Sequence, residues 1–208
     1  MRTGTRRSRA LPFALVVLTL SAAVSPAQEA ERAADAAAAR GGPADFDYLL
    51  GDWAFTAKSR QWGAFGGAWS AVRLPEGQIL DEYRIVGDGG DTLYVTTTLR
   101  NFNRATGRWD LVGADAGGGL RDTGTAGRVG DEMHVEQTFG ATSDSPSLWR
   151  IRYFDIRPDR FSWAADRSTD GGKTWVKDFQ TIEARRVGPP RELPPLTRPG
   201  AATPAGSR

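Results

Sequence analysis

The strongest constraint on the fold is a hydrophobic pattern with a period of two residues, which runs from residue 45 to residue 186. Short segments rich in β-branched and aromatic side chains alternate there with clusters of Gly, Asp, Asn and Pro. A period of two is that of a β-strand, and the intervening residues are those of tight turns. The pattern predicts a helical turn at 45–50 and about ten strands, at residues 51–58, 69–74, 78–86, 93–102, 108–114, 120–128, 132–139, 148–156, 160–166 and 174–185.

Strands at such regular spacing are typical of a β-sandwich or an antiparallel barrel. Alternation divides each strand into two faces. The apolar face holds Ile79, Tyr83, Ile85, Leu93, Val95, Leu99, Trp109, Leu111, Met133, Val135, Phe139, Trp149, Ile151, Tyr153, Phe161 and Trp163. The polar face holds Glu82, Arg84, Thr96, Thr98, Arg100, His134, Glu136, Thr138, Arg150, Arg152, Ser162 and Asp166. One dry and one wet face suit a closed barrel in water, so we predict an all-β protein with a single up-and-down antiparallel β-barrel.

Several polar groups fall on the apolar face: Asp81, Thr97, Gln137 and the hydroxyls of Tyr83 and Tyr153. Burying such groups without partners costs about 1–3 kcal/mol each. They therefore bond one another, as most buried polar groups do, or they line a cavity in the barrel mouth. For the second case, the candidate ligand-binding residues are Trp53, Asp81, Tyr83, Thr97, Gln137, Trp149, Tyr153 and Trp163.

The first 27 residues have the pattern of a cleaved signal peptide. Four arginines and no acids precede an apolar run at residues 11–24, and Ser25-Pro26-Ala27 supplies small residues for cleavage. An apolar run of this length is shorter than the roughly 20 residues of a membrane-spanning helix; an uncleaved anchor is the alternative. We expect a periplasmic or secreted protein.

Composition narrows the partners and the domain boundaries. The net charge of the whole chain is +2, but residues 28–208 hold 23 basic and 25 acidic residues once the four leader arginines are removed, which does not favour nucleic acid. The chain has no cysteine, so an exported domain must rely on its own core. We expect an alanine-rich linker at 28–44, the barrel at 45–186, and a disordered Pro-rich tail at 187–208.

The residue patterns of common active sites are missing from the sequence. His134 is the single histidine and falls on the wet face, and no serine lies in a Gly-x-Ser-x-Gly elbow. The acids that occur in turns lack the spacing of metal ligands. We therefore expect no catalytic residue, no metal site and no cofactor.

Three motifs resemble those of an exported bacterial family of unknown function with a lipocalin-like, calycin-type barrel. They are Phe-Asp-Tyr-Leu-Leu-Gly-Asp-Trp at 46–53, Asn-Arg-Ala-Thr-Gly-Arg-Trp at 103–109, and Ser-Thr-Asp-Gly-Gly-Lys-Thr-Trp at 168–175. The resemblance covers residues 45–186. It implies a structural role for Trp53 at the closed end beneath Arg185 or Arg186. Residues 168–175 also match the Asp-box of sialidase-type propellers, a hairpin device that occurs here once.

These features support three hypotheses, which follow in order of decreasing support. The first is a barrel that binds a small apolar or amphipathic molecule outside the cytoplasm. The second is a structural or interaction module that uses the barrel exterior or the Pro-rich tail. The third is an enzyme that uses the region of Asp81, Gln137 and Tyr153, although no activated nucleophile or base is visible there.

Overall fold

The computed structural model describes residues 41–197, and almost all of its regular structure is β. A short 3₁₀ turn, η1 (Asp47–Leu49), comes before eleven strands. The strands are β1 (Gly51–Ser59), β2 (Gly63–Arg73), β3 (Ile79–Val86), β4 (Thr92–Asn103), β5 (Arg108–Asp115), β6 (Gly119–Val129), β7 (Glu132–Phe139), β8 (Ser147–Arg157), β9 (Arg160–Ser168), β10 (Val176–Gly188) and β11 (Arg191–Glu192).

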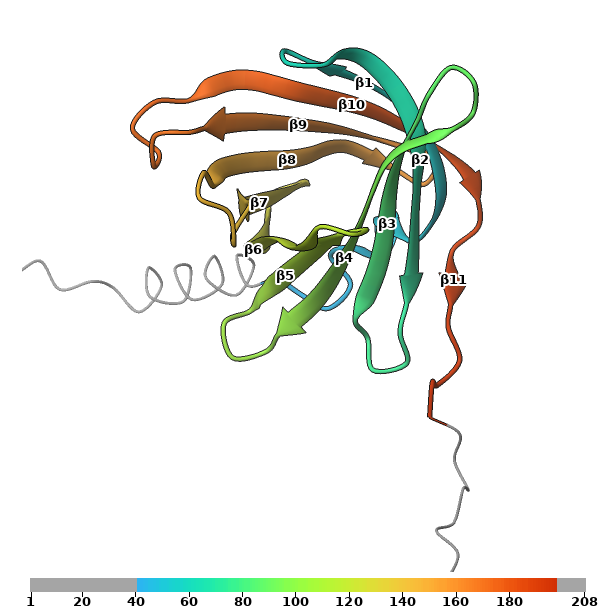
Figure 1. Ribbon diagram of the computed structural model, residues 1–208. Helices are drawn as coiled ribbons and strands as arrows, with labels where there is room; N and C mark the ends of the chain where they lie inside the picture. The colour runs from blue at the N-terminus through green and yellow to red at the C-terminus, as the bar shows by residue number, and fades with distance from the viewer. Residues whose placement is uncertain (1–40, 198–208) are drawn as a thin grey trace, which may run out of the picture. The chain divides into compact units, whose positions relative to one another are not determined.

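The strands β1 to β10 form one closed barrel (Figure 1). Each pairs antiparallel with its neighbour in sequence, and β1 pairs with both β2 and β10, so the sheet closes on itself. Closure removes the exposed strand edges that otherwise favour aggregation. The predicted fold class, an up-and-down antiparallel barrel with a short N-terminal turn, is confirmed.

Most strand boundaries lie within two residues of the predicted ones, and β2 is the exception. It begins at Gly63, six residues before the predicted start, because its first half is rich in glycine and carries little hydrophobic signal. Gly67 in this half permits a close approach of the neighbouring strand. A Cβ atom there would lie 1.9 Å from the carbonyl oxygen of Arg84.

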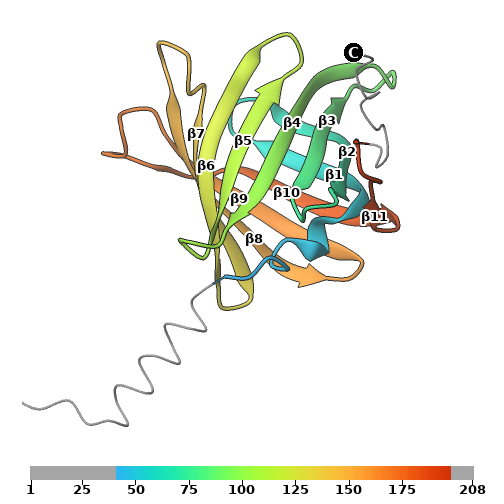
Figure 2. The same cartoon turned by 90° about the horizontal axis from the view of Figure 1, so that it is seen from below.

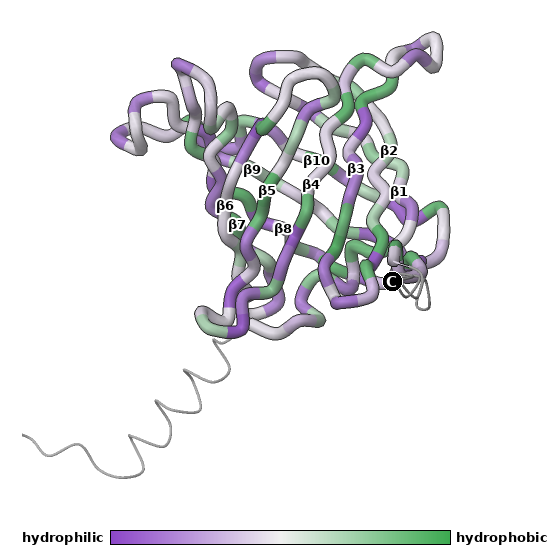
Figure 3. Tube along the Cα trace, turned by 60° about the horizontal axis from the view of Figure 1, so that its bottom comes forward, coloured by the Kyte–Doolittle hydropathy of each residue, from purple (hydrophilic) through white to green (hydrophobic). Residues whose placement is uncertain are grey.

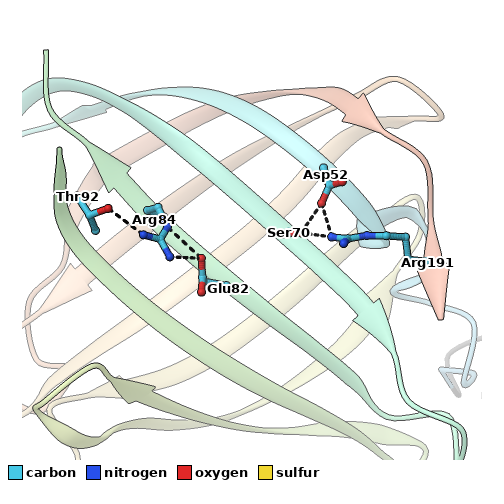
Figure 4. Close-up of polar contacts among 6 residues, drawn as sticks. All are labelled: Asp52, Ser70, Glu82, Arg84, Thr92 and Arg191. Carbon is cyan, nitrogen blue, oxygen red and sulfur yellow. Dashed lines mark hydrogen bonds and ion pairs between the residues drawn. The ribbon is translucent and has the colours of Figure 1, made fainter. Parts of the chain in front are cut away.

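Hydrophobic and hydrophilic residues follow one another along the strands (Figure 3). This alternation assigns the inner face correctly in most of the barrel. The buried core contains predicted inner residues from five strands: Ile79, Trp109, Leu111, Met133, Val135, Trp149, Ile151, Tyr153, Phe161 and Trp163. The polar pairs of the outer face are also present. Glu82 and Arg84 bond each other on the outside of β3, and Arg84 also reaches Thr92 (Figure 4).

The face assignment of β4 is wrong. Thr98 and Arg100 are buried, whereas Leu99 is 39% exposed. Thr98 lies opposite Asp81 in the ladder, and opposite residues share a face of the sheet. A buried carboxylate without a partner costs several kcal/mol, so pairing with Asp81 outweighs the weak hydrophobic alternation of β4 and brings Arg100 inside.

One end of the barrel is closed by the segment around η1, which crosses it before β1 begins (Figure 2). Phe46, Leu49 and Trp53 are fully buried there. The Trp53 indole donates to the carbonyl of Leu49 over 2.8 Å, and the guanidinium of Arg186 lies 4.1 Å from the Trp53 ring centre. The expected arginine above Trp53 is therefore Arg186, and not Arg185.

Arg186 also ties this closed end together through its hydrogen bonds. It donates to the carbonyl oxygens of Leu50 at 2.5 Å, Tyr48 at 2.9 Å and Pro158 at 2.5 Å. These carbonyls belong to the turn before β1 and to the β8–β9 connection. One side chain on the last barrel strand thus joins two separate stretches of backbone.

The chain continues in regular structure beyond the predicted end of the barrel. β10 extends to Gly188, and β11 pairs in parallel with the last residues of β2. Arg191 donates to Asp52 at 2.5 Å and to Ser70 at 2.7 Å on the outside of the barrel (Figure 4). The prediction of disorder from Val187 is therefore wrong for residues 187–192, because backbone pairing and these polar contacts offset the scarcity of apolar residues. The predicted signal peptide, most of the linker and residues 198–208 lie outside the described residues.

The motif at 168–175 forms a tight hairpin between β9 and β10. Asp170 accepts hydrogen bonds from the Thr174 amide and hydroxyl, and its own position is fixed by Ser168. These hydrogen bonds lower the pKa of Asp170 to about 2. The Trp175 ring packs under the guanidinium of Arg150 at 4.1 Å. The motif acts as a turn, as predicted.

Candidate functional site

The open half of the barrel contains a cavity of about 570 Å³. It begins beside Trp69 and Asp81 near the barrel centre and ends at Trp62 and Leu93 in the mouth. Trp62 is 55% exposed and Leu93 is 63% exposed, so solvent reaches the cavity through this end. Its volume falls within the range of pockets that hold small molecules.

One wall of the cavity is largely aromatic and aliphatic. It is built from β2, β7, β8, β9 and β10 and includes Phe65, Trp69, Phe139, Trp149, Ile151, Tyr153, Trp163 and Ile182. Several of these rings are in contact: the ring centres of Phe139 and Trp149 are 4.7 Å apart, and those of Trp69 and Tyr83 are 5.4 Å apart. Packing among the rings fixes the shape of this wall before any ligand arrives.

The other wall is polar, and a buried ion pair lies at its inner end. Arg100 donates from Nε to Oδ2 of Asp81 over 2.6 Å, while Oδ1 of Asp81 accepts from the Trp69 indole over 2.9 Å. Both oxygens of Asp81 are therefore engaged. Burial by itself would lower the pKa of Arg100, but the Asp81 carboxylate outweighs that effect and raises it, so the guanidinium stays protonated. Nη1 of Arg100 is buried and has no hydrogen-bond partner within residues 41–197.

Farther toward the mouth, a β-bulge directs two successive residues of β6 into the cavity. Gly113 lies opposite Asp122 and Ala114 lies opposite Leu120, so Arg121 is the extra residue. A bulge breaks the alternation of a strand and re-aims side chains, and both Arg121 and Asp122 line the cavity. Arg121 pairs with Asp115 at 3.4 Å.

Asp122 is the least compensated group of this wall. It is only 2% exposed, and Oδ1 is buried with no hydrogen-bond partner in the part of the chain that the structure describes. Burial raises the pKa of its carboxyl from 3.8 to about 6. Its place depends on Gly113, because a Cβ atom at that position would lie 1.7 Å from Oδ1 of Asp122.

Six of the eight candidate residues line this cavity: Asp81, Tyr83, Gln137, Trp149, Tyr153 and Trp163. Burial raises the pKa of the hydroxyls of both Tyr83 and Tyr153. Trp53 lies instead in the packed closed end, where no cavity reaches it. Thr97 is on the outer face of β4, and its neighbours Thr96 and Thr98 line the cavity in its place. The inverted face of β4 explains the error at Thr97.

Sequence reasoning missed the four residues that give the cavity its polar chemistry: Arg100, Arg121, Asp122 and Thr98. Arg100 and Thr98 were placed outside by the alternation of β4. Arg121 and Asp122 are adjacent in sequence, and alternation allows only one of two neighbours to face inward. The glycine at position 113, directly across from Asp122, is the one sequence signal that could have marked the site, because an inward glycine leaves space for a neighbour.

A second, smaller hollow of about 370 Å³ lies on the outside of β7, β8 and β9. His134 lines it and contacts Glu132 at 2.8 Å, so it lies on the outer face as the alternation predicted. Among residues 41–197, no group of three His, Cys, Asp or Glu side chains is arranged to hold a metal ion. No helix within the same range is long and apolar enough to cross a membrane.

Comparison with known proteins gives no relative from which a role could be transferred. No protein-family model matches the chain, and no curated protein matches its sequence. The function is therefore inferred from the cavity.

Proposed function

We propose that this protein binds a small apolar or amphipathic molecule inside its barrel. The observation that carries the proposal is the cavity of about 570 Å³, which has an aromatic wall, a polar wall and an exposed mouth. The resemblance to lipocalin-like barrels supports the same reading. So does the packing of Arg186 on Trp53, which is the arrangement that this resemblance implies.

An empty cavity lowers the stability of a folded protein. Protein interiors normally pack as densely as organic crystals, and side chains that border a void lose dispersion contacts on that side. A small-molecule site accepts this cost because the ligand restores the contacts when it binds. The large rings of this barrel, such as Trp149 and Trp163, line the cavity.

Native mass spectrometry of the protein purified from its own host tests the proposal directly. We expect a bound molecule that is released on unfolding. In a parallel assay, a neutral naphthalene dye should bind with one-to-one stoichiometry and quench tryptophan emission, because Trp69, Trp149 and Trp163 line the cavity.

Thr96→Phe and Thr97→Phe form a matched pair for this assay. The two positions are adjacent on β4, but only Thr96 lines the cavity. Thr96→Phe should reduce dye affinity about tenfold or more by filling the mouth, whereas Thr97→Phe should leave it unchanged. Equal effects of the two substitutions, or no dye binding by the parent protein, would contradict the proposal.

We also propose that the protein works in the periplasm or outside the cell after cleavage near Ala27. The support is the arginine-rich start and the apolar run of residues 11–24. N-terminal sequencing of the protein from its host should find a chain that begins at Gln28. A chain that still begins at Met1 would contradict cleavage.

A further inference from the structure

We propose that the ligand carries a protonated amine on an apolar body and that Asp122 receives this amine. The inference rests on the proposed binding function and narrows it to a chemical class, amphipathic cations. It is carried by the charge balance of the polar wall and by the burial of a carboxylate that has no partner.

The charge balance of this wall leaves one carboxylate over. Two ion pairs are present: Arg100 with Asp81 at 2.6 Å, and Arg121 with Asp115 at 3.4 Å. The second pair is the looser one, because Nε of Arg121 has no hydrogen-bond partner in residues 41–197 and Asp115 lies outside the cavity lining. Asp122 is the third carboxylate of the group. Among the described residues, the charged side chains that line the cavity are Asp81, Arg100, Arg121 and Asp122, and Asp115 lies behind them. When Asp122 is ionised, this group of two arginines and three carboxylates therefore carries one net negative charge.

The position of Asp122 is built by the fold. The bulge in β6 turns it inward, and the missing side chain of Gly113 leaves room for its carboxyl group. Oδ1 is buried against Gly113 without a hydrogen-bond partner in the described residues, and the Asp122 side chain lines the cavity. An unpaired charge in such a place is costly, and a cationic donor from a ligand would remove that cost through a charge-assisted hydrogen bond.

The aromatic rings around this carboxylate suit a cation as well as an apolar body. Aromatic faces attract ammonium and guanidinium groups. Arg121 already lies 5.7 Å from the ring centre of Phe139 and 6.0 Å from that of Tyr94. A ligand amine at Asp122 would lie in the same aromatic surroundings.

The competing ligand class is an organic anion bound to Arg100, whose Nη1 has no partner in residues 41–197. Arg100 is already neutralised by Asp81. An anion would therefore add a second uncompensated negative charge beside Asp122, or would require Asp122 to take up a proton. The charge balance favours the cation, and the two classes give opposite results in the experiment below.

The experiment uses three dansyl probes with the same naphthalene body and a different tail: dansyl cadaverine is cationic, dansyl amide is neutral, and dansyl-aminohexanoate is anionic. Each is titrated into the full chain at pH 7.5, and energy transfer from the cavity tryptophans is measured. We expect dansyl cadaverine to bind at least about tenfold more tightly than dansyl amide, as a charge-assisted bond would give. Dansyl-aminohexanoate should bind most weakly.

Asp122→Asn is the matched variant. It keeps the shape of the side chain, removes the charge, and relieves a buried carboxylate, so the variant should fold at least as well as the parent. We expect it to lose the preference for dansyl cadaverine and to bind dansyl amide within about twofold of the parent. Any binding of probe to residues 1–40 is the same in the parent and in Asp122→Asn, so it does not affect the difference in affinity between them.

The affinity for dansyl cadaverine is also measured as a function of pH, because purely hydrophobic binding would not depend on pH. Asp122 is faced by Arg121, Asp115, Arg100 and Asp81, and its carboxyl has a pKa of about 6. Affinity for dansyl cadaverine should therefore fall below pH 6 in the parent and stay flat in Asp122→Asn.

Three results would overturn the inference. They are tightest binding of dansyl-aminohexanoate, equal binding of all three probes, and a cation preference that survives in Asp122→Asn. Equal binding would leave the proposed function standing. The absence of binding by all three probes would instead contradict the proposed function itself.

Discussion

The two ends of the barrel are built from the same strands but differ in how their polar side chains are hydrogen-bonded. At the closed end, the Trp53 indole donates to Leu49, and Arg186 donates to three backbone carbonyls. In the open half, Nη1 of Arg100 and Oδ1 of Asp122 have no partner within the described residues. A barrel stable enough to keep one half hollow needs its other half densely packed. The closed end is so packed, although the buried hydroxyl of Tyr48 in η1 has no hydrogen-bond partner in the described residues. The comparison assigns stability to the closed end and recognition to the open half.

The largest effect should come from Trp53→Ala at the closed end. Trp53 is fully buried, and truncating such a side chain typically costs about 3–5 kcal/mol of the free energy of unfolding. Urea denaturation measures the loss. Trp62→Ala at the exposed mouth is the control, with an expected change of at most about 1 kcal/mol. Equal losses at the two positions would break the comparison between the ends.

Arg186→Met should have the next largest effect. The substitution keeps much of the aliphatic stem but removes the donors to Tyr48, Leu50 and Pro158. The first two bonds are partly buried, and acceptors that lose their donor away from water are costly. We expect a loss of about 2–3 kcal/mol in the same denaturation experiment. Arg185→Met changes the exposed neighbour on β10 and should stay within about 0.5 kcal/mol of the parent.

Asp122→Asn should act in the opposite direction and stabilise the protein. The folded-state pKa of about 6 lies above the ordinary carboxyl pKa of 3.8, so the folded state binds the proton more tightly than the unfolded chain. The stabilising contribution of this carboxyl is therefore complete below about pH 4 and is lost as the pH rises to 6.

At pH 7, Asp122→Asn should consequently be more stable than the parent by about 1–3 kcal/mol, with the difference vanishing near pH 4. Thermal unfolding of both proteins across this pH range measures the difference and cancels the other carboxyls. A constant difference at all pH values would show that Asp122 does not titrate in this window.

The smallest effect should come from Arg191→Ala. Arg191 joins Asp52 and Ser70 on the outside of the barrel, and half of its side chain is exposed. Exposed ion pairs contribute about 0–1 kcal/mol and weaken with salt. We expect a loss within that range that shrinks further at high salt. A loss as large as that of Arg186→Met would show that β11 is part of the closed end rather than an addition to it.

The accuracy of the sequence predictions differs between the same two regions. Trp109, Phe161 and Met133 could be placed in the core because hydrophobic burial is local to each strand and repeats with period two. Arg100 could not, because its burial depends on Asp81 of another strand. Asp122 could not, because a bulge breaks the alternation on which the prediction depends.

The sequence alone determined the all-β class, nearly all strand boundaries and the up-and-down order, since turn residues and alternating hydrophobicity act over a few neighbours. It also identified six of the residues that line the cavity. Only the tertiary structure decided which face of β4 points inward, which arginine covers Trp53, and that Arg121 and Asp122 both enter the cavity. The face of β4 depends on pairing Arg100 with Asp81 of another strand, because a cost of several kcal/mol for an unpaired buried charge exceeds the local preference of the strand. The position of Arg186 depends on carbonyl groups brought together by the fold, and the entry of Arg121 and Asp122 depends on the bulge opposite β5.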